Sequence, residues 1–357
     1  MKIYISLPVT LALVLRAYSR KSLTPFGIFA AVLTAAAHAV HPWSVFFALL
    51  VVFFLAGTAV TKVKHNVKSK LTLSSAGGST AIPKPRNHVQ VFANSIVASI
   101  LVPLHAYFLY KEGRAEEQCW QNGARPRISD ILVFGIVGNY AAVAADTFSS
   151  ELGILSPKKP RLITAPWKFV PPGTNGAITS SGINAGLIGG FVISTTAALL
   201  LPFCTTGPNA WSFRQRADFS ILMTFVGLFG SLLDSLLGAL LQASVLDVRS
   251  GKIIEAEGGG KVPVQVSGSL HMNPEARLRA RMGDGDGDKA VEHTVKAAGK
   301  HKGESRRVEV GRDVLSNNGV NLLMALTTSG VAIAGAAWAW DVPLSELWAQ
   351  VRGIYQS

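Results

Sequence analysis

Long runs of apolar residues divide the chain into eight segments of the kind that cross membranes. A helix rises about 1.5 Å per residue, so about 20 apolar residues are needed to cross roughly 30 Å of hydrocarbon. The runs extend over about Lys2–Leu15, Pro25–Val40, Trp43–Val60, His88–Tyr110, Ile128–Ser150, Ile178–Phe203, Phe219–Leu246 and Val320–Trp340, of which the first two are short. The pattern predicts an all-α, polytopic transmembrane helix bundle with about eight spans.

Polar stretches between these runs predict five regions. We expect amino-terminal transmembrane helices over residues 1–72, a linker over 73–85, a core transmembrane motif region over 86–246, a disordered loop over 247–315, and a final transmembrane helix with a tail over 316–357. The long loop is basic and rich in glycine, a composition that buries too little apolar surface to offset its ordering entropy. Its GDGDGD stretch, residues 283–288, is similar to a calcium loop, but Lys289 and Val295 stand where the turn glycine and the bidentate glutamate are needed. Calcium binding is therefore not favoured.

Composition and charge assign a topology to this bundle. The chain is 49% hydrophobic and 15% charged, with a formal net charge of +13. The basic clusters lie in the odd-numbered loops and contain no acidic residue, which predicts that these loops, and the long loop after the seventh span, face the cytosol. The basic excess thus reflects topology and contact with anionic lipid, and nucleic acid is not an expected partner.

Two local features leave alternatives open. The first apolar run could be a cleaved signal sequence, but no small-residue cleavage site precedes Arg16 and further spans follow, which favours a retained helix. Cys119 and Cys204 both fall on the predicted non-cytosolic side, where a disulfide can form. Two unpaired thiols at helix ends are the favoured interpretation.

The fifth predicted helix carries polar residues that are costly inside a membrane and therefore suggest a function. Asp146 and Ser150 lie four residues apart, and Asn139 lies seven residues before Asp146, so the three share one helix face. Glu151 points elsewhere on a continuous helix, and both acids could bind one ion only if the helix unwinds near Gly153. Hydrogen bonding of this face to a neighbouring helix is the alternative.

The seventh predicted helix carries a second intramembrane acid. Asp234 lies in a stripe of small and polar residues that comprises Gly227, Gly230, Asp234, Gly238 and Gln242. Small residues allow close helix packing, whereas a carboxylate among them suggests a metal or proton-transfer group. We also expect the small-residue face of this helix to admit a lipid chain.

Amide side chains begin two further helices. Asn87, Gln90 and Asn94 share a face at the start of the fourth helix, and Asn317, Asn318 and Asn321 open the eighth. Amides both donate and accept hydrogen bonds, so they could orient carboxylates or bind a nucleotide. Helix capping explains Asn317 or Asn318 equally well.

The loop between the fifth and sixth helices has the composition of an anion site. Its basic residues are Lys158, Lys159, Arg161 and Lys168, and its turn contains Gly173, Thr174, Asn175 and Gly176. Backbone N–H groups of a glycine-containing turn at a helix start can cradle phosphate, with lysine or arginine beside them. All these polar groups fall at the predicted cytosolic face, where carboxylates could hold Mg²⁺ and basic groups could hold phosphates.

The strings ADTFSSELG, KPRLIT, VPPGTNGAITSSG, GSLLDSLLGALLQ and LSNNGVNLL resemble the successive motifs of the transmembrane protein 19 family, over about residues 86–323. This family includes plant phytyl-phosphate kinase, so the resemblance implies an integral membrane kinase that converts an isoprenoid monophosphate to its diphosphate with CTP or another nucleoside triphosphate. The motif residues that it carries over are Asp146, Ser150, Glu151, Gly173, Asn175, Gly176, Asp234, Ser235, Gln242, Asn318 and Asn321.

The residues and the resemblance together suggest a lipid-phosphate kinase in the endoplasmic reticulum or another endomembrane. Asp146, Glu151 and Asp234 would bind Mg²⁺, with Ser150 at the same catalytic site. Two alternatives remain: an ion- or proton-coupled transporter that uses Asp146 and Asp234 near the bilayer midplane, and a non-catalytic membrane scaffold. The sequence does not specify the oligomeric state.

Overall fold

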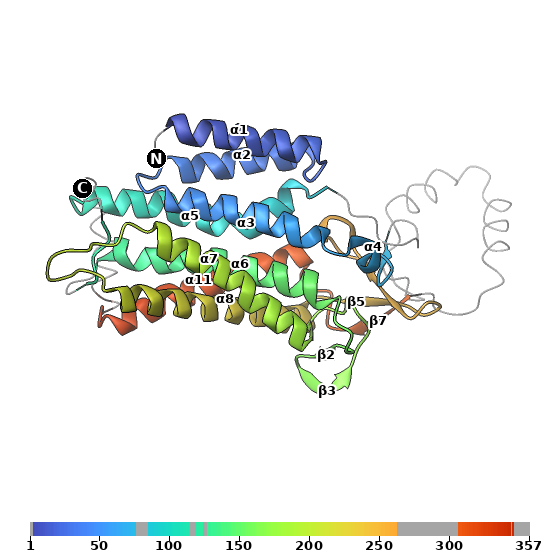
Figure 1. Cartoon of the computed structure of the whole chain (residues 1–357). Coiled ribbons are helices and arrows are strands. Elements are labelled where there is room, and N and C mark those ends of the chain that lie inside the picture. Colours follow the sequence, from blue (N-terminus) through green and yellow to red (C-terminus); the bar gives the residue numbers. More distant parts are fainter. Residues whose placement is uncertain are drawn as a thin grey trace, which may run out of the picture.

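The computed structural model of the chain describes residues 3–75, 85–114, 119–123, 127–262, 306–343 and 345. Within these ranges, six helices are long and apolar enough to cross a membrane. They are α3 (Val45–Lys62), α5 (His88–Lys111), α6 (Ile128–Gly153), α7 (Ser180–Leu200), α8 (Phe213–Leu241) and α11 (Asn317–Ala339). Two shorter apolar helices, α1 (Ile3–Ser19) and α2 (Pro25–Ala39), lie along one edge of the bundle (Figure 1). The prediction of a multi-pass helical bundle is confirmed, and its count of eight includes these two short helices.

Helix α6 is the central element of the bundle. It packs against α3, α5, α7, α8 and α11, and its membrane-crossing window is buried throughout. Glycines bring the neighbouring helices close: a Cβ added to Gly189 of α7 would lie 2.6 Å from the Ala144 carbonyl oxygen, and one added to Gly227 of α8 would lie 2.8 Å from that of Ala141. The small-residue face of α8 is therefore filled around Gly227 and Gly230 by α6, α7 and α11. Gly238, on the same face, lines a cavity at the end of the bundle, so at that end the expectation that this face admits a lipid chain stays a prediction.

Two small β-sheets and a short helix stand at one end of the bundle. The first sheet has the order β1 (Leu73–Ser74), β6 (Lys252–Glu255), β5 (Ser244–Asp247), β7 (Arg306–Val310); β1 and β6 are parallel and the other pairs antiparallel. The second is antiparallel, with β2 (Arg161–Leu162) between β3 (Ala165–Phe169) and β4 (Ala177–Ile178). The short helix is α4 (His65–Lys68).

These sheets correct the sequence prediction in one respect. The segment 247–315 was expected to be disordered, but its two ends form β6, the 3-10 turn η1 (Glu257–Gly259) and β7. Pairing with β5 and β1 supplies the backbone hydrogen bonds that this polar segment cannot obtain from apolar burial. Residues 263–305, which include the GDGDGD stretch, lie outside the described residues.

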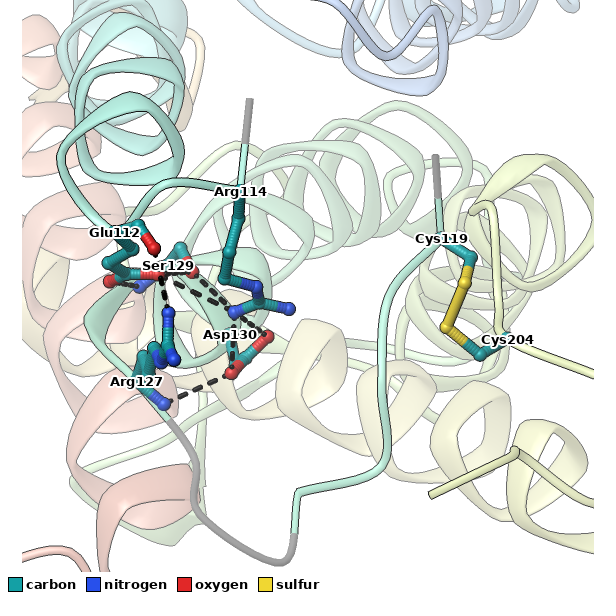
Figure 2. A network of polar contacts seen from close by, with 7 residues as sticks. All are labelled: Glu112, Arg114, Cys119, Arg127, Ser129, Asp130 and Cys204. Carbon is teal, nitrogen blue, oxygen red and sulfur yellow. Dashed lines mark hydrogen bonds and ion pairs between the residues drawn. A yellow bond between two sulfur atoms is a disulfide. The ribbon is translucent and has the colours of Figure 1, made fainter. Parts of the chain in front are cut away.

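The opposite end of the bundle is closed by covalent and ionic contacts. Cys119 and Cys204 form a disulfide across 85 residues of sequence, so the interpretation as unpaired thiols is wrong. Figure 2 shows this bond near a network in which Arg114 Nη1 lies 3.0 Å from both carboxylate oxygens of Asp130 and donates to Ser129 Oγ at 3.0 Å. The side chains of Arg114 and Asp130 are only 6% and 5% exposed. Beside the disulfide, an aromatic cluster packs around the fully buried Trp120 and includes Phe134, Phe203, Trp211, Phe219 and Trp340.

Candidate functional site

A cavity of about 600 Å³ occupies the end of the bundle that carries the sheets. Its walls come from the last turns of α6 and α8, from the first turns of α5, α7 and α11, and from the loops between them. A helix start carries partial positive charge and a helix end partial negative charge. Three helix starts and two helix ends therefore give one cavity an anion-attracting and a cation-attracting part.

Two carboxylates from different helices line this cavity. Asp146 lies seven residues before the end of α6 at Gly153, and Asp234 lies seven residues before the end of α8 at Leu241. At 1.5 Å per residue, both are roughly 10 Å below the helix ends. Both carboxylates face the same cavity, so a cation bound there could contact both of them.

Glu151 faces the same cavity but is already paired. Its Oε2 accepts a hydrogen bond of 2.6 Å from Lys68 Nζ, which also donates to the carbonyl oxygens of Val60 and Thr61 at the end of α3. Helix α6 continues to Gly153, so the unwinding that would aim Glu151 and Asp146 at one ion does not occur. Glu151 is the counter-ion of Lys68, and the structure does not join it to the Asp146 and Asp234 pair.

Arg86, which sequence analysis did not assign to the site, also lines the cavity. Its Nη2 donates to Thr61 Oγ1 at 3.0 Å, and its backbone N–H donates to the Ser22 carbonyl oxygen, which connects the cavity to the α1–α2 hairpin. Burial lowers the pKa of the Arg86 guanidinium, and the negative charge of Glu151 opposes that shift. Arg86 is thus a half-buried cation at the cavity wall.

The amides at the starts of α5 and α11 reach the acidic part of the cavity. The Asn321 amide nitrogen, in the orientation that satisfies its neighbours, donates to Asp234 Oδ2 at 3.2 Å and to the Asn317 carbonyl oxygen at 3.0 Å, and the Asn321 amide oxygen lies 3.3 Å from the Asn94 amide. Asn318 donates instead to the Gly258 carbonyl oxygen at 2.9 Å, while the α11 cap is Ser316. Asn321 therefore orients a carboxylate, and Asn318 fixes a loop.

The four predicted basic residues separate into two pairs. Lys158 and Lys159 line the cavity, whereas Arg161 and Lys168 do not. Arg161 donates to the Pro166 carbonyl oxygen at 2.8 Å and lies 4.6 Å above the Phe169 ring, and Lys168 forms an ion pair of 3.6 Å with Glu309. Only the first pair can neutralise an anion within the cavity.

The glycine-containing turn after β3 is held rigidly at the cavity wall. Gly173 and Gly176 have φ values of +84° and +77°, and a Cβ on Gly176 would collide with Ala239 of α8. The Asn175 N–H donates to Ser244 Oγ at 2.8 Å, and Thr174 Oγ1 donates to the Pro171 carbonyl oxygen at 2.7 Å. The turn shapes the wall, but these two donors already have protein acceptors. Ser150 and Gln242 line the same cavity.

A second glycine-rich segment at the cavity was missed. We call residues 256–262 the glycine strap; Gly259, Gly260 and Lys261 of this segment line the cavity. Gly259 has φ +71°, and a Cβ there would lie 2.5 Å from Asn318 Oδ1. Lys261 forms an ion pair of 3.1 Å with Asp313, just before α11. Three consecutive glycines before a lysine could have indicated this turn, but the strap adjoins the low-complexity loop.

Glu255, at the end of β6, is a further acidic group that faces the cavity. Desolvation by the surrounding protein raises the pKa of its carboxyl, the hydrogen bond from Thr72 opposes that shift, and the negative charge of Glu151 adds to it. Glu255 was not recognised from sequence because its neighbours were assigned to the disordered loop.

The protein-family model of "Integral membrane protein DUF92" matches residues 8–329. The chain belongs to this family. Protein PGR of Arabidopsis thaliana is 36% identical over 64% of this chain and 75% of its own length. An uncharacterized membrane protein of Methanocaldococcus jannaschii, MJ0933, is 38% identical over 38% of this chain and 51% of its own.

The chloroplastic protein VTE6 of Arabidopsis thaliana is 29% identical over 43% of this chain and 40% of its own length. No solved structure matches the chain. The matches confirm the resemblance to the transmembrane protein 19 family that the motifs indicated.

The side chains of the cavity fit a magnesium ion bound together with phosphates. The described parts of the chain contain no group of three or more histidine, cysteine, aspartate or glutamate residues that could hold a metal unaided. Mg²⁺ is usually held by one or two carboxylates, with water and substrate phosphates completing its octahedron. Asp146 and Asp234 supply two such carboxylates, and the cavity volume leaves room for the remaining ligands.

Proposed function

We propose that this protein is a membrane kinase that transfers the terminal phosphoryl group of CTP or another nucleoside triphosphate to an isoprenoid or related lipid monophosphate. The observation that carries the proposal is the single cavity lined by Asp146, Asp234, Lys158 and Lys159, at one end of a bundle of membrane-spanning helices. Membership of the family that includes plant phytyl-phosphate kinase supports the same reaction.

The proposed reaction needs no protein nucleophile. An oxygen of the lipid phosphate attacks the γ-phosphorus, the bond from that phosphorus to the β–γ bridging oxygen breaks, and the nucleoside diphosphate leaves with the electron pair. Mg²⁺, when bound to Asp146 and Asp234, would neutralise charge on the nucleotide phosphates. Lys158 and Lys159 hold the phosphates, Arg86 adds positive charge at the wall, and Asn321 keeps the Asp234 carboxylate oriented. Catalysis then consists of positioning and charge compensation.

The position of the carboxylates favours this reaction over transport. Asp146 and Asp234 lie well beyond the midpoints of α6 and α8, toward the cavity end. A transporter site is expected near the bilayer midplane with access from both faces. A kinase requires access to a soluble nucleotide from one face only.

We further propose that the cavity faces the cytosol of an endomembrane, such as the endoplasmic reticulum. Two features support this orientation. Basic loops surround the cavity end, and the Cys119–Cys204 disulfide lies at the opposite end, as expected for an oxidising compartment. Reaction of a cysteine introduced at the exposed Val248 with an impermeant maleimide in sealed microsomes tests it: labelling without permeabilisation supports the orientation, and labelling only after permeabilisation contradicts it.

The kinase is tested with the purified full chain in lipid nanodiscs. Prenyl monophosphates of several lengths are incubated with Mg²⁺ and each nucleoside triphosphate, and the diphosphate product is separated and quantified. We expect product with one pair and its loss in Asp146→Asn. Arg249→Gln, an exposed substitution in the β5–β6 turn, is the matched control and should retain activity. Absence of product with every pair, in protein that remains folded, contradicts the proposal.

A further inference from the structure

The β2–β3 hairpin, residues 161–169, presents large aromatic side chains to its surroundings. It projects away from the bundle beside the cavity end, just past the ends of the long helices (Figure 1). Trp167 is 78% exposed and Phe169 is 55% exposed. Aromatic side chains this exposed are unusual in contact with water alone, and they point to a partner that covers them.

The hairpin has two chemically different faces. Side chains alternate along a strand, so Trp167 and Phe169 share one face of β3 and Lys168 lies on the other, where it pairs with Glu309. Arg161 joins the aromatic face, since its guanidinium lies 4.6 Å above the Phe169 ring. This face therefore combines two aromatic rings with an unburied cation.

The hairpin lies at the level where a membrane-spanning helix ends. Leu162 and Val170, at its base, pack against Ala239 in the last turn of α8. Around the same turn, Leu236 and Leu240 point outward and are 39% and 48% exposed, as expected for lipid-facing residues. Tryptophan and other aromatic residues concentrate at this depth, where the ring contacts acyl chains and headgroups together.

The charge of the segment selects the kind of lipid. Between Gly153 and Asp218 the sequence contains no acidic residue, and the stretch includes Lys158, Lys159, Arg161 and Lys168. Basic residues near a membrane surface are attracted to anionic headgroups. Since Lys158 and Lys159 line the cavity, the same segment leads from the hairpin to the site.

We propose that the β2–β3 hairpin is an interfacial anchor: Trp167 and Phe169 insert among the phospholipid headgroups beside the cavity, and Arg161 binds an anionic lipid phosphate. The proposal requires only that the helices span a bilayer, so it holds whether or not the chain is a kinase. It also accounts for Arg161, which the cavity does not use. The anchor would hold the cavity edge against the surface from which a lipid substrate comes.

Tryptophan fluorescence tests the anchor in the full chain reconstituted in nanodiscs. The difference between wild type and Trp167→Phe isolates the emission of Trp167, and the substitution removes little packing because the side chain is 78% exposed. We expect phosphatidylcholine brominated near the headgroup to quench this emission and aqueous iodide to leave it unchanged. Quenching by iodide without quenching by brominated lipid would overturn the proposal.

The choice of an anionic headgroup is tested in nanodiscs with and without phosphatidylserine. Arg161→Gln should lose the increase in brominated-lipid quenching that phosphatidylserine produces. Arg249→Gln removes the same charge from the exposed turn between β5 and β6 and should keep that increase. Equal behaviour of the two variants would show that Arg161 does not bind the anionic lipid and would overturn that part of the proposal.

Discussion

The two ends of the helix bundle contain acidic side chains in opposite arrangements: Asp130 is buried, whereas Asp146 and Asp234 are half-buried. At the disulfide end, Arg114 lies within 3.0 Å of Asp130 and the Arg127 backbone N–H donates to Asp130 Oδ2 at 3.0 Å, while Ser129 donates to Glu112 (Figure 2). At the cavity end, Asp146 and Asp234 line one cavity of about 600 Å³, and neither forms a salt bridge with another described residue. A buried charge that is compensated within the protein contributes to structure, whereas one that is left for a ligand costs stability and indicates a site.

The largest expected effect comes from removing a cavity carboxylate. Asp234→Asn keeps the hydrogen bond from Asn321 but removes a metal ligand, so we expect kinase turnover to fall about 1,000-fold. The free energy of unfolding should stay the same or rise, because one of two half-buried carboxylates in the same cavity loses its charge. Product formation and thermal unfolding in detergent measure the two quantities. A large loss of stability would mean that Asp234, like Asp130, stabilises the fold, and the two ends would then not differ in this respect.

The same substitution at the other end should have the reverse effect. Asp130→Asn takes the negative charge from a buried ion pair with Arg114, and we expect unfolding to become easier by about 3 kcal/mol. Turnover per folded molecule should be unchanged, since the network lies at the far end of α6 from the cavity. Chemical unfolding followed by the signal of the aromatic cluster measures the loss. Unchanged stability would mean that the network contributes no net energy.

Those features of the two ends that depend on the geometry of a single helix could be predicted from the sequence. Membrane spans follow from the length of apolar runs, and the spacing of Asp146 and Ser150 assigns them to one face, because helix geometry is local. Other features depend on tertiary contacts: the disulfide, the Lys68–Glu151 ion pair, and the different partners that Arg161 and Lys168 find outside the cavity. Strands of two to five residues, such as β1 and β7, are too short to produce a recognisable alternation, so the sheets were missed as well.

The glycine strap allows a sharper test of how the cavity wall is built. Gly259→Ala and Gly251→Ala both force alanine into a positive φ, +71° and +67°, which costs about 1–2 kcal/mol in each case. A Cβ at Gly251 meets nothing within 4 Å, whereas one at Gly259 meets Asn318 Oδ1 at 2.5 Å. The first variant should therefore lose about 2 kcal/mol more stability than the second.

Nucleotide affinity provides a second readout for the same pair. Gly259→Ala displaces Asn318 from the strap and should weaken nucleotide binding, while Gly251→Ala should leave it unchanged. Calorimetric titration with a nonhydrolysable triphosphate compares them. If both variants lose the same stability and bind the nucleotide equally well, the glycine strap can move to accommodate the added Cβ without loss of stability, and it does not shape the cavity.

The smallest expected effect concerns acidic groups in the sheet next to the cavity. Desolvation raises the pKa of Glu255, so this carboxyl binds protons more tightly when folded than when unfolded, and its contribution to stability declines as pH rises from the unfolded to the folded pKa. Glu255→Gln should then be more stable than wild type at neutral pH, and the difference should vanish below the ordinary glutamate pKa.

The pKa of Asp247, in the same sheet, is shifted in the opposite direction from that of Glu255, so Asp247 serves as the control for the Glu255 titration. The hydrogen bond from Ser250 lowers the pKa of Asp247, so its contribution is present above the ordinary aspartate pKa and is lost as pH falls through the folded pKa. Asp247→Asn should therefore be slightly less stable than wild type at neutral pH, with the difference vanishing in acid. Two pH profiles of opposite sign would show the same contrast within a single sheet. The Glu255 carboxyl, which faces the cavity, would be desolvated without full compensation, whereas the Asp247 carboxyl, which faces away, would be satisfied by its neighbours. Profiles of the same sign would mean that the cavity wall compensates Glu255 as fully as the turn compensates Asp247.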